Sequence, residues 1–259
     1  MSNAPDDGRS PPSALRGRLA DVYVPALVSG ALEALSRRLG NRATIDDPLY
    51  GRAASLASID PLLARVASYF ADAGATYEHV CSTTGVDRDA AEGRLSMTIG
   101  GQARALPIAI VAERRRLREI ELRVYYAPEG APPGRKPRAP LLSAERGERS
   151  SQLPLAQLIE EIVEGVRKGA VEQALAGFEE EGRIVDPAGR AHTKKDGAMG
   201  TFLSELGELD IAIGGDADDG RTACVEATVT RRGREAGPAL LAFQRGDSGL
   251  VNELRVYWE

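Results

Sequence analysis

The stretch "ELRVYY" at residues 121–126 returns almost unchanged as "ELRVYW" at residues 253–258. A second pair of similar stretches lies upstream in the same order, "ATIDDPLYGRA" at 43–53 and "GRIVDPAGRA" at 182–191. Both members of this second pair place an Asp-Pro step after a short apolar run. Two landmarks that recur in the same order at similar offsets indicate an internal duplication.

The segment between the two copies, residues 128–152, is rich in Pro, Gly, Arg and Ser, a composition that predicts a flexible, partly extended linker. Residues 1–12 are polar and rich in Pro, and they predict a disordered tail. The predicted domains are therefore residues 13–127 and residues 153–259.

Each copy follows the same predicted plan. A helical pattern, interrupted in the first copy by Pro25 and Gly30, precedes the short strand that ends at the Asp-Pro step. A second helix is predicted to begin with Asp60 as its N-cap and Pro61 as its first residue. The remainder of each copy predicts three antiparallel strands bounded by Gly, Pro and Asp. Helices followed by antiparallel strands predict an α+β fold, with a curved sheet wrapped around helices.

The composition excludes several classes of protein. Apolar residues make up 42% of the chain, charged residues 27%, and the net charge is −5, which is typical of a soluble globular protein and disfavours a nucleic-acid-binding surface. The sequence contains no run of 18 consecutive apolar residues, so no membrane span is predicted. The N-terminus also lacks the apolar core of a secretory signal. Two cysteines and two histidines predict no metal site and no cofactor, and a cytoplasmic location.

The strand pattern suggests where a ligand would bind. Side chains two residues apart share one face of a strand, so a set of apolar and aromatic side chains is expected to form one wall. These residues are Leu95, Met97 and Ile99, Ile108 and Ile110, and Val124 and Tyr126, with Trp258 as the counterpart of Tyr126 in the second copy. They predict a pocket for a small hydrophobic molecule, although the same pattern suits a packed core between helix and sheet.

The stretch "LADVYVPALVSGALEALSRRLGNRATIDDP", residues 19–48, resembles the N-terminal half of bacterial ketosteroid isomerases. These enzymes belong to the superfamily of nuclear transport factor-like and SnoaL-like cone-shaped α+β barrels. The resemblance implies two cones in one chain that pair as an internal pseudo-dimer, compatible with a monomer. It also implies that Asp47 is a general base and that Tyr23, 24 residues earlier, donates a hydrogen bond to an oxyanion.

The chain departs from the family pattern at the second oxyanion donor. The matching positions are Ile110 in the first copy and Leu241 in the second, and neither side chain can donate a hydrogen bond. In the second copy Ile162 replaces the tyrosine, so Asp186 is only a weak catalytic candidate. Asp-Pro steps also initiate turns, and this structural interpretation stays open for both aspartates. The neighbouring Asp46 is predicted to be solvated on the opposite face of its strand.

Together these features predict an acid/base isomerase or cyclase that removes a proton next to a carbonyl group in the pocket of the first repeat. The alternative is a non-catalytic module of the same fold that binds a hydrophobic ligand or takes part in assembly. The Asp-Arg-Asp set of the epoxide-hydrolase members of this superfamily is not found in the chain.

Overall fold

The computed structural model describes residues 17–115, 119–127, 138, 154–207, 209–231 and 237–258. The predicted tail at 1–12 lies outside the described residues, as does the predicted linker at 128–152 apart from Arg138. The elements of the first repeat are α1 (Leu19–Ser29), α2 (Leu32–Leu39), β1 (Ala43–Asp47), β2 (Gly51–Ala53), α3 (Leu56–Asp72), β3 (Thr76–Thr84), β4 (Arg88–Ile99), β5 (Gln102–Arg115) and β6 (Glu119–Tyr125).

The second repeat contains the same elements in the same order. They are α4 (Pro154–Arg167), α5 (Val171–Ala176), β7 (Phe178–Val185), β8 (Ala191–Thr193), α6 (Ala198–Leu206), β9 (Leu209–Asp218), β10 (Thr222–Arg231), β11 (Gly237–Arg245) and β12 (Val251–Trp258). Their strands form two sheets of identical topology, β2-β1-β6-β5-β4-β3 and β8-β7-β12-β11-β10-β9. In each sheet the strand with the Asp-Pro step runs parallel to the last strand, and the other neighbouring strands are antiparallel. The chain is therefore a tandem duplication of one α+β cone.

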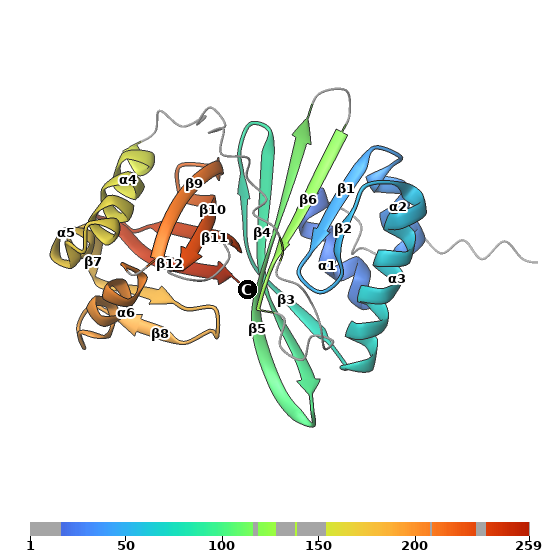
Figure 1. Cartoon of the computed structure of the whole chain (residues 1–259), viewed down its shortest axis with the longest axis horizontal. Coiled ribbons are helices and arrows are strands. Elements are labelled where there is room, and N and C mark those ends of the chain that lie inside the picture. The colour runs from blue at the N-terminus through green and yellow to red at the C-terminus, as the bar shows by residue number, and fades with distance from the viewer. Residues whose placement is uncertain are drawn as a thin grey trace, which may run out of the picture.

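The two cones are arranged with their sheets together and their helices apart. Figure 1 shows the two sheets in the middle of the molecule, with α1, α2 and α3 at one end and α4, α5 and α6 at the other. Each sheet encloses its own apolar core on the helix side. None of the described helices combines the length and apolar character needed to span a membrane.

Three local features differ from the sequence predictions. Helix α1 continues through Pro25 and ends at Gly30, which adopts a left-handed conformation with φ of 74°. Helix α3 begins at Leu56 rather than after Asp60, because Ser55 and Ser58 form a reciprocal capping box one turn earlier. The sheet also gains β3, where only Thr83 is buried and a bulge interrupts the register, so the apolar alternation that predicts a strand is missing.

The repeated ELRVY stretch lies at the junction of the two sheets. Because side chains alternate along β6, Leu122 and Val124 enter the first core, whereas Arg123 and Tyr125 face the second repeat. The same alternation holds in β12. A small apolar cluster joins the two sheets and consists of Ala90, Ala109, Val111 and Tyr125 from the first repeat and Ala217, Cys224, Leu240, Ala242 and Tyr257 from the second.

Two buried ionic clusters flank this apolar contact. Arg123 donates to Glu226 of the second repeat, with Nη2 at 2.7 Å from Oε2, and the hydroxyl of Tyr125 donates to the same carboxylate. In the reverse direction, Arg255 Nε donates to Glu92 Oε2 at 2.6 Å and the hydroxyl of Tyr257 donates to it at 2.7 Å. The odd residues of the repeated stretch therefore form the contact between the repeats.

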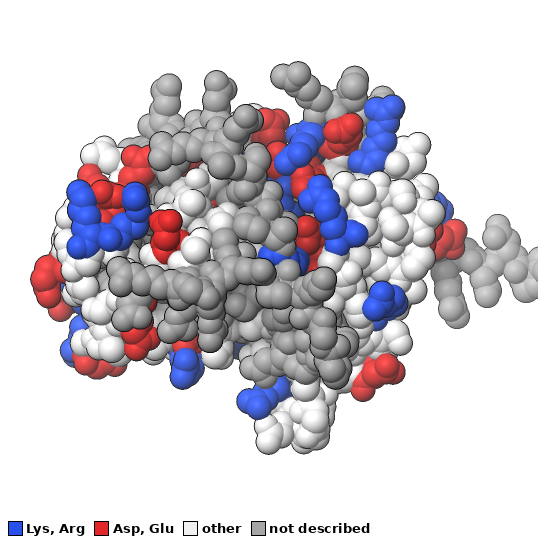
Figure 2. All heavy atoms as spheres, in the orientation of Figure 1, with Lys and Arg blue, Asp and Glu red and all other residues white. Residues whose placement is uncertain are grey.

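Charges of both signs are interspersed over the face of the molecule drawn in Figure 2. The basic residues visible there are not gathered into one broad patch. The distribution agrees with the mild net charge of −5.

Candidate functional site

Asp47 lies at the end of β1, in the interior of the first cone, and its side chain is buried. Its Oδ1 accepts hydrogen bonds from the backbone N–H groups of Leu49 at 2.8 Å and Tyr50 at 3.1 Å, so the aspartate shapes the turn that follows it. Burial raises the pKa of Asp47 from 3.8 to about 6, and the two backbone hydrogen bonds and the nearby Arg138 oppose the rise. The carboxylate therefore titrates close to neutral pH.

Two tyrosine hydroxyls share this buried region. Tyr23 on α1 and Tyr126, which follows β6, are both buried, and neither hydroxyl has a hydrogen-bond partner among the described residues. Burial and then the negative charge of Asp47 raise the pKa of Tyr23. The pKa of Tyr126 is raised by burial and then by Asp47 and Tyr23. Both phenols consequently stay protonated and can donate hydrogen bonds near Asp47.

The side chains predicted to form the pocket wall surround this region as part of the first core. Leu95, Met97, Ile108, Ile110 and Val124 are buried in the same cluster as Tyr23 and Tyr126, and Ile99 packs against it while partly exposed. Ile110 lies opposite Val124 in the pairing of β5 with β6, so an apolar side chain occupies the position of the second donor. The interior of the first cone is apolar around its three polar groups.

Arg138 binds the end of β1 through Asp46 and the neighbouring strand β6 through Val124. Its Nη1 donates to the carbonyl of Asp46 at 3.1 Å and to Asp46 Oδ1 at 3.3 Å, and its Nη2 donates to the carbonyl of Val124 at 2.8 Å. Asp46 is therefore buried and ion-paired, with Arg52 Nη1 at 3.6 Å as well, and the prediction that it is solvated is wrong. The reason is that this face of β1 is covered by arginine side chains instead of water.

In the second repeat, Asp186 has a different environment. Its Oδ1 accepts from the backbone N–H groups of Ala188 and Arg190, both at 2.9 Å, and its Oδ2 contacts Arg190 Nε at 2.8 Å and His192 Nε2 at 3.2 Å. Burial raises the pKa of Asp186, but these hydrogen bonds outweigh it and hold the pKa below its usual value. The group is an ionised carboxylate that holds a turn.

The other residues of the second cone fill its interior. Ile162, at the tyrosine position, is buried in the second core, and Leu241 lies opposite Val256 in the same core. Trp258 packs against this core and stacks on Phe202 at 6.5 Å between ring centroids, so it lies in the second cone rather than beside Asp47. His192 is partly buried and stacks on Phe202, with ring centroids at 4.6 Å.

Sequence reasoning missed two contributions to the site. Tyr126 was expected to line the pocket through its ring, but its hydroxyl has no hydrogen-bond partner among the described residues and its pKa is raised by Asp47 and Tyr23. The signal was available, because Tyr126 shares a strand face with Val124 by the period of two. Arg138 falls in a segment predicted as a linker, and nothing in the local sequence indicates that this one side chain is buried.

Comparison with protein-family models gives no match, and neither does a comparison with curated proteins. Solved structures do resemble the chain. They include an NTF2-like protein of unknown function from Cytophaga hutchinsonii, at 12% identity over 42% of this chain and 94% of its own, with a TM-score of 0.35. A putative ketosteroid isomerase from Kribbella flavida matches at 20% identity over 40% of this chain and 76% of its own, with a TM-score of 0.34.

A further similar structure is an epoxide hydrolase/cyclase-like enzyme described in pyran ring formation in the polyether salinomycin. It is 18% identical over 40% of this chain and 89% of its own, with a TM-score of 0.36. Each of these proteins spans about two-fifths of the present chain, the size of one repeat. The similarity carries no assignment of activity.

Proposed function

We propose that the first repeat is an acid/base isomerase or cyclase that removes a proton next to the carbonyl group of a small apolar compound. The observation that carries this proposal is one buried region in which a carboxylate with a pKa of about 6 lies near two phenols without hydrogen-bond partners among the described residues. A base is most effective when its pKa lies near the working pH, and the phenols supply donors for a developing negative charge.

In the proposed reaction the carboxylate of Asp47 accepts a proton from the carbon next to the carbonyl group. The electron pair of the broken C–H bond forms an enolate, whose oxygen accepts hydrogen bonds from Tyr23 and Tyr126. An isomerase then returns the proton from Asp47 to a different carbon. A cyclase instead directs the enolate carbon to a second carbonyl group of the same molecule, and the alkoxide formed there takes up the proton from Asp47. Neither outcome needs an external oxidant or reductant.

The substrate class follows from the surroundings of Asp47. The side chains around it are aliphatic or aromatic, and the centre is covered, with 1% of Asp47 exposed. A substrate therefore reaches the carboxylate by displacing apolar side chains, which favours a small apolar ketone over a charged or strongly polar compound. In the second repeat the ionised, hydrogen-bonded Asp186 lacks these partners and is given no catalytic part.

The test compares the wild-type chain with Asp47→Asn and the matched control Asp186→Asn. Isomerisation of a β,γ-unsaturated ketone is followed by the ultraviolet absorbance of its conjugated product. Exchange of ketone α-protons in D₂O, followed by NMR, reports the first step for carbonyl compounds that do not isomerise. We expect Asp47→Asn to lower the rate by about 10²–10⁴, as for loss of a general base, and Asp186→Asn to change it less than about twofold. Equal rates for wild type and Asp47→Asn would sink the base assignment.

Tyr23→Phe and Tyr126→Phe test the two donors separately. Each substitution removes only a hydroxyl, so the packing of the ring is kept. We expect each to lower kcat by about 10²–10³, the usual effect of removing one donor to an oxyanion. If Tyr126→Phe leaves kcat unchanged while Tyr23→Phe does not, Tyr126 has a packing role only.

The second candidate function is a non-catalytic binding or assembly module. The observation in its favour is the packed interior of the first cone, where all the groups of the proposed centre are buried. This candidate predicts that an apolar ketone, if it binds, undergoes neither isomerisation nor α-proton exchange faster than in buffer.

A further inference from the structure

A groove unrelated to the Asp47 centre lies between α1 and β3. It has a volume of about 420 Å³ and is lined by Asp21, Pro25, Val28, Ser29, Tyr77, His79 and Ser82. The four residues from α1 form one stripe, because successive residues of a helix are turned by about 100°. Tyr23 points about 200° away from Asp21 on the same helix, toward the core. The groove and the proposed acid/base centre thus lie on opposite sides of α1.

A β-bulge builds the sheet side of the groove. In the pairing of β3 with β4, His79 lies opposite Gly93 and Cys81 lies opposite Glu92, so Val80 is an extra residue. In a regular strand Ser82 would point to the opposite face from Tyr77 and His79, because side chains alternate and Ser82 lies an odd number of positions from both. The bulge turns Ser82 toward α1 and leaves Cys81 facing the second repeat, where its Sγ lies 3.9 Å from Thr222 Oγ1.

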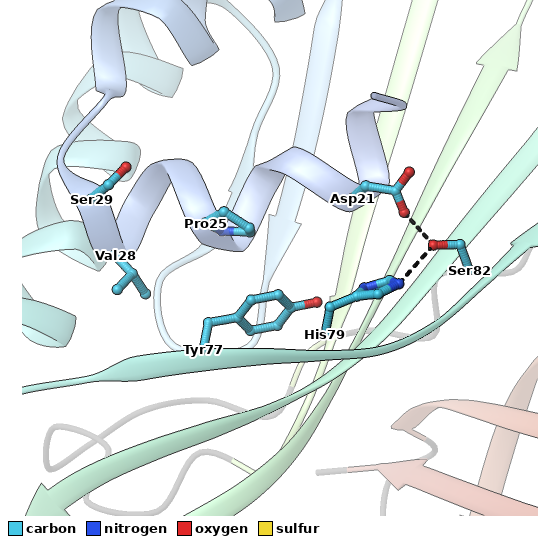
Figure 3. Close-up of a pocket in the computed structure, with 7 residues that line it drawn as sticks. All are labelled: Asp21, Pro25, Val28, Ser29, Tyr77, His79 and Ser82. Atoms are coloured by element: carbon cyan, nitrogen blue, oxygen red, sulfur yellow. Dashed lines mark hydrogen bonds between the residues drawn. The ribbon is translucent and has the colours of Figure 1, made fainter. Parts of the chain in front are cut away.

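One end of the groove carries a directional hydrogen-bond chain. Figure 3 shows Asp21 from α1 and His79 from β3 converging on Ser82. The Ser82 hydroxyl donates to Asp21 Oδ1 at 2.6 Å, and Ser82 Oγ lies 3.1 Å from His79 Nε2. A hydroxyl has one hydrogen to donate, so His79 Nε2–H donates to Ser82 Oγ. The chain therefore ends on the carboxylate of Asp21.

The groove presents an excess of hydrogen-bond acceptors and negative charge at this end. Among the described residues, no Lys or Arg lies within ion-pair distance of Asp21, and none lines the groove. Pro25 has no N–H group to donate to the carbonyl of Asp21 one helical turn earlier. Among the residues that the structure describes, the carboxylate and the backbone carbonyl of Asp21 therefore have no cationic partner.

The other end is apolar around one phenol. The ring of Tyr77 lies against Gly93, where an added Cβ would stand 2.2 Å from a ring carbon, so the glycine permits this close approach. The hydroxyl of Tyr77 is buried without a hydrogen-bond partner among the described residues. Pro25 and Val28 of α1 line the groove across from the ring (Figure 3).

We propose that this groove binds an organic cation, a protonated primary amine attached to a small aromatic or aliphatic body. The ammonium group donates to the carboxylate and the carbonyl of Asp21, a charge-assisted contact, and the body packs on Pro25, Val28 and the ring of Tyr77. The Tyr77 hydroxyl offers one further polar contact to the bound molecule. This proposal stands independently of the acid/base function assigned to Asp47.

The test uses benzylammonium and its uncharged analogue benzyl alcohol as probes on the full chain. Binding is measured by calorimetry and by chemical-shift changes of backbone amides in α1 and β3. We expect benzylammonium to bind with a Kd of about 1 mM or tighter and benzyl alcohol to bind at least about tenfold more weakly. We expect the chemical-shift changes to be largest for the backbone amides of Asp21, of the residues on either side of Pro25, and of β3.

Two substitutions of equal charge change separate the groove from general electrostatics. Asp21→Asn removes the proposed partner and is expected to weaken benzylammonium binding at least about tenfold. Glu78→Gln removes a carboxylate from the adjacent strand position, where Glu78 is exposed and faces Arg94 at 3.8 Å, and it is expected to change binding less than about twofold. Equal binding of the amine and the alcohol, an unaffected Asp21→Asn, or amide shifts elsewhere in the chain would each overturn the proposal.

Discussion

Asp47 and Asp186 stand at matching steps of the two repeats, yet their environments give them opposite properties. The Asp47 carboxylate is buried among apolar side chains and two phenols, and its pKa rises to about 6. The Asp186 carboxylate receives hydrogen bonds from Arg190 and His192, and its pKa falls. The matching Asp-Pro steps therefore hold a carboxylate with a raised pKa in one cone and a carboxylate with a lowered pKa in the other.

The sheet faces that contact each other differ much less between the two repeats than the interiors of the cones do. Each repeat offers an Arg and a Tyr from its last strand to a buried Glu of the other repeat. The contact between the repeats is thus nearly symmetric, while the chemistry inside the cones is not. Alternate side chains of the same strands face the other repeat and the interior of the cone. The interior can therefore change in sequence while the contact between the repeats is kept.

The largest stability effect is expected at the contact between the repeats. Arg255→Met removes from buried Glu92 the guanidinium that donates to it. Arg123→Met removes from buried Glu226 its hydrogen-bonded guanidinium and leaves it only the longer contact with Arg88 at 3.7 Å. Removing one member of a buried ion pair costs about 3–5 kcal/mol, so we expect each variant to lose that much free energy of unfolding. Urea denaturation measures the loss.

Arg37→Met is the matched control, because Arg37 forms only an exposed ion pair with Glu33 at 3.4 Å. It should cost less than about 1 kcal/mol. Losses of similar size for Arg123→Met and Arg255→Met would establish that the two clusters contribute equally. A loss at either site no greater than the control would contradict a supporting role for that cluster.

The next effect is a dependence of stability on pH that distinguishes the two aspartates. The folded protein raises the pKa of Asp47 from 3.8 to about 6, so it binds this proton more tightly than the unfolded chain. The resulting stabilisation is complete below pH 4 and is lost as the pH rises toward and through 6, an effect on the order of 3 kcal/mol. We therefore expect Asp47→Asn to be more stable than wild type above pH 6 and to lose this advantage near pH 4.

Chemical denaturation at several pH values measures this difference, and subtraction of the two curves cancels the other titrating groups. A difference that does not vary between pH 4 and pH 7 would contradict the raised pKa. A more stable but inactive Asp47→Asn variant would show that the carboxylate is retained in the core at a cost in stability.

The smallest effect is expected for Asp186→Asn, and it has the opposite sign. The lowered pKa of Asp186 means that its charge stabilises the fold above the unfolded pKa, and this contribution disappears as the pH falls through the folded value. Asn keeps an acceptor for the backbone N–H groups but not the charge that faces Arg190, so we expect a loss of about 1–2 kcal/mol at pH 7. Thermal unfolding at pH 7 and at acidic pH tests this, and a variant more stable than wild type at pH 7 would contradict it.

Much of the fold could be predicted because it depends on local sequence patterns that occur in both repeats. The ELRVY alternation and the Asp-Pro steps predicted two α+β copies, and both sheets have the same strand order. The start of α3 was predicted incorrectly because Asp60 and Pro61 form an apparent helix start, whereas Ser55 and Ser58 together satisfy the N-terminal backbone. Strand β3 was missed because only one of its residues, Thr83, is buried and Val80 interrupts the alternation.

The sequence by itself determined the duplication, the α+β class and the positions of Asp47 and Tyr23 as candidates, since each depends on spacing along the chain. Only the tertiary structure decided that Tyr126 joins them, that Arg138 covers Asp46, and that Glu92 and Glu226 each meet an arginine of the other repeat. The physical reason is that burial and charge pairing depend on residues far apart in sequence. Those distant neighbours give two matching aspartates different pKa values, and with them different proposed roles.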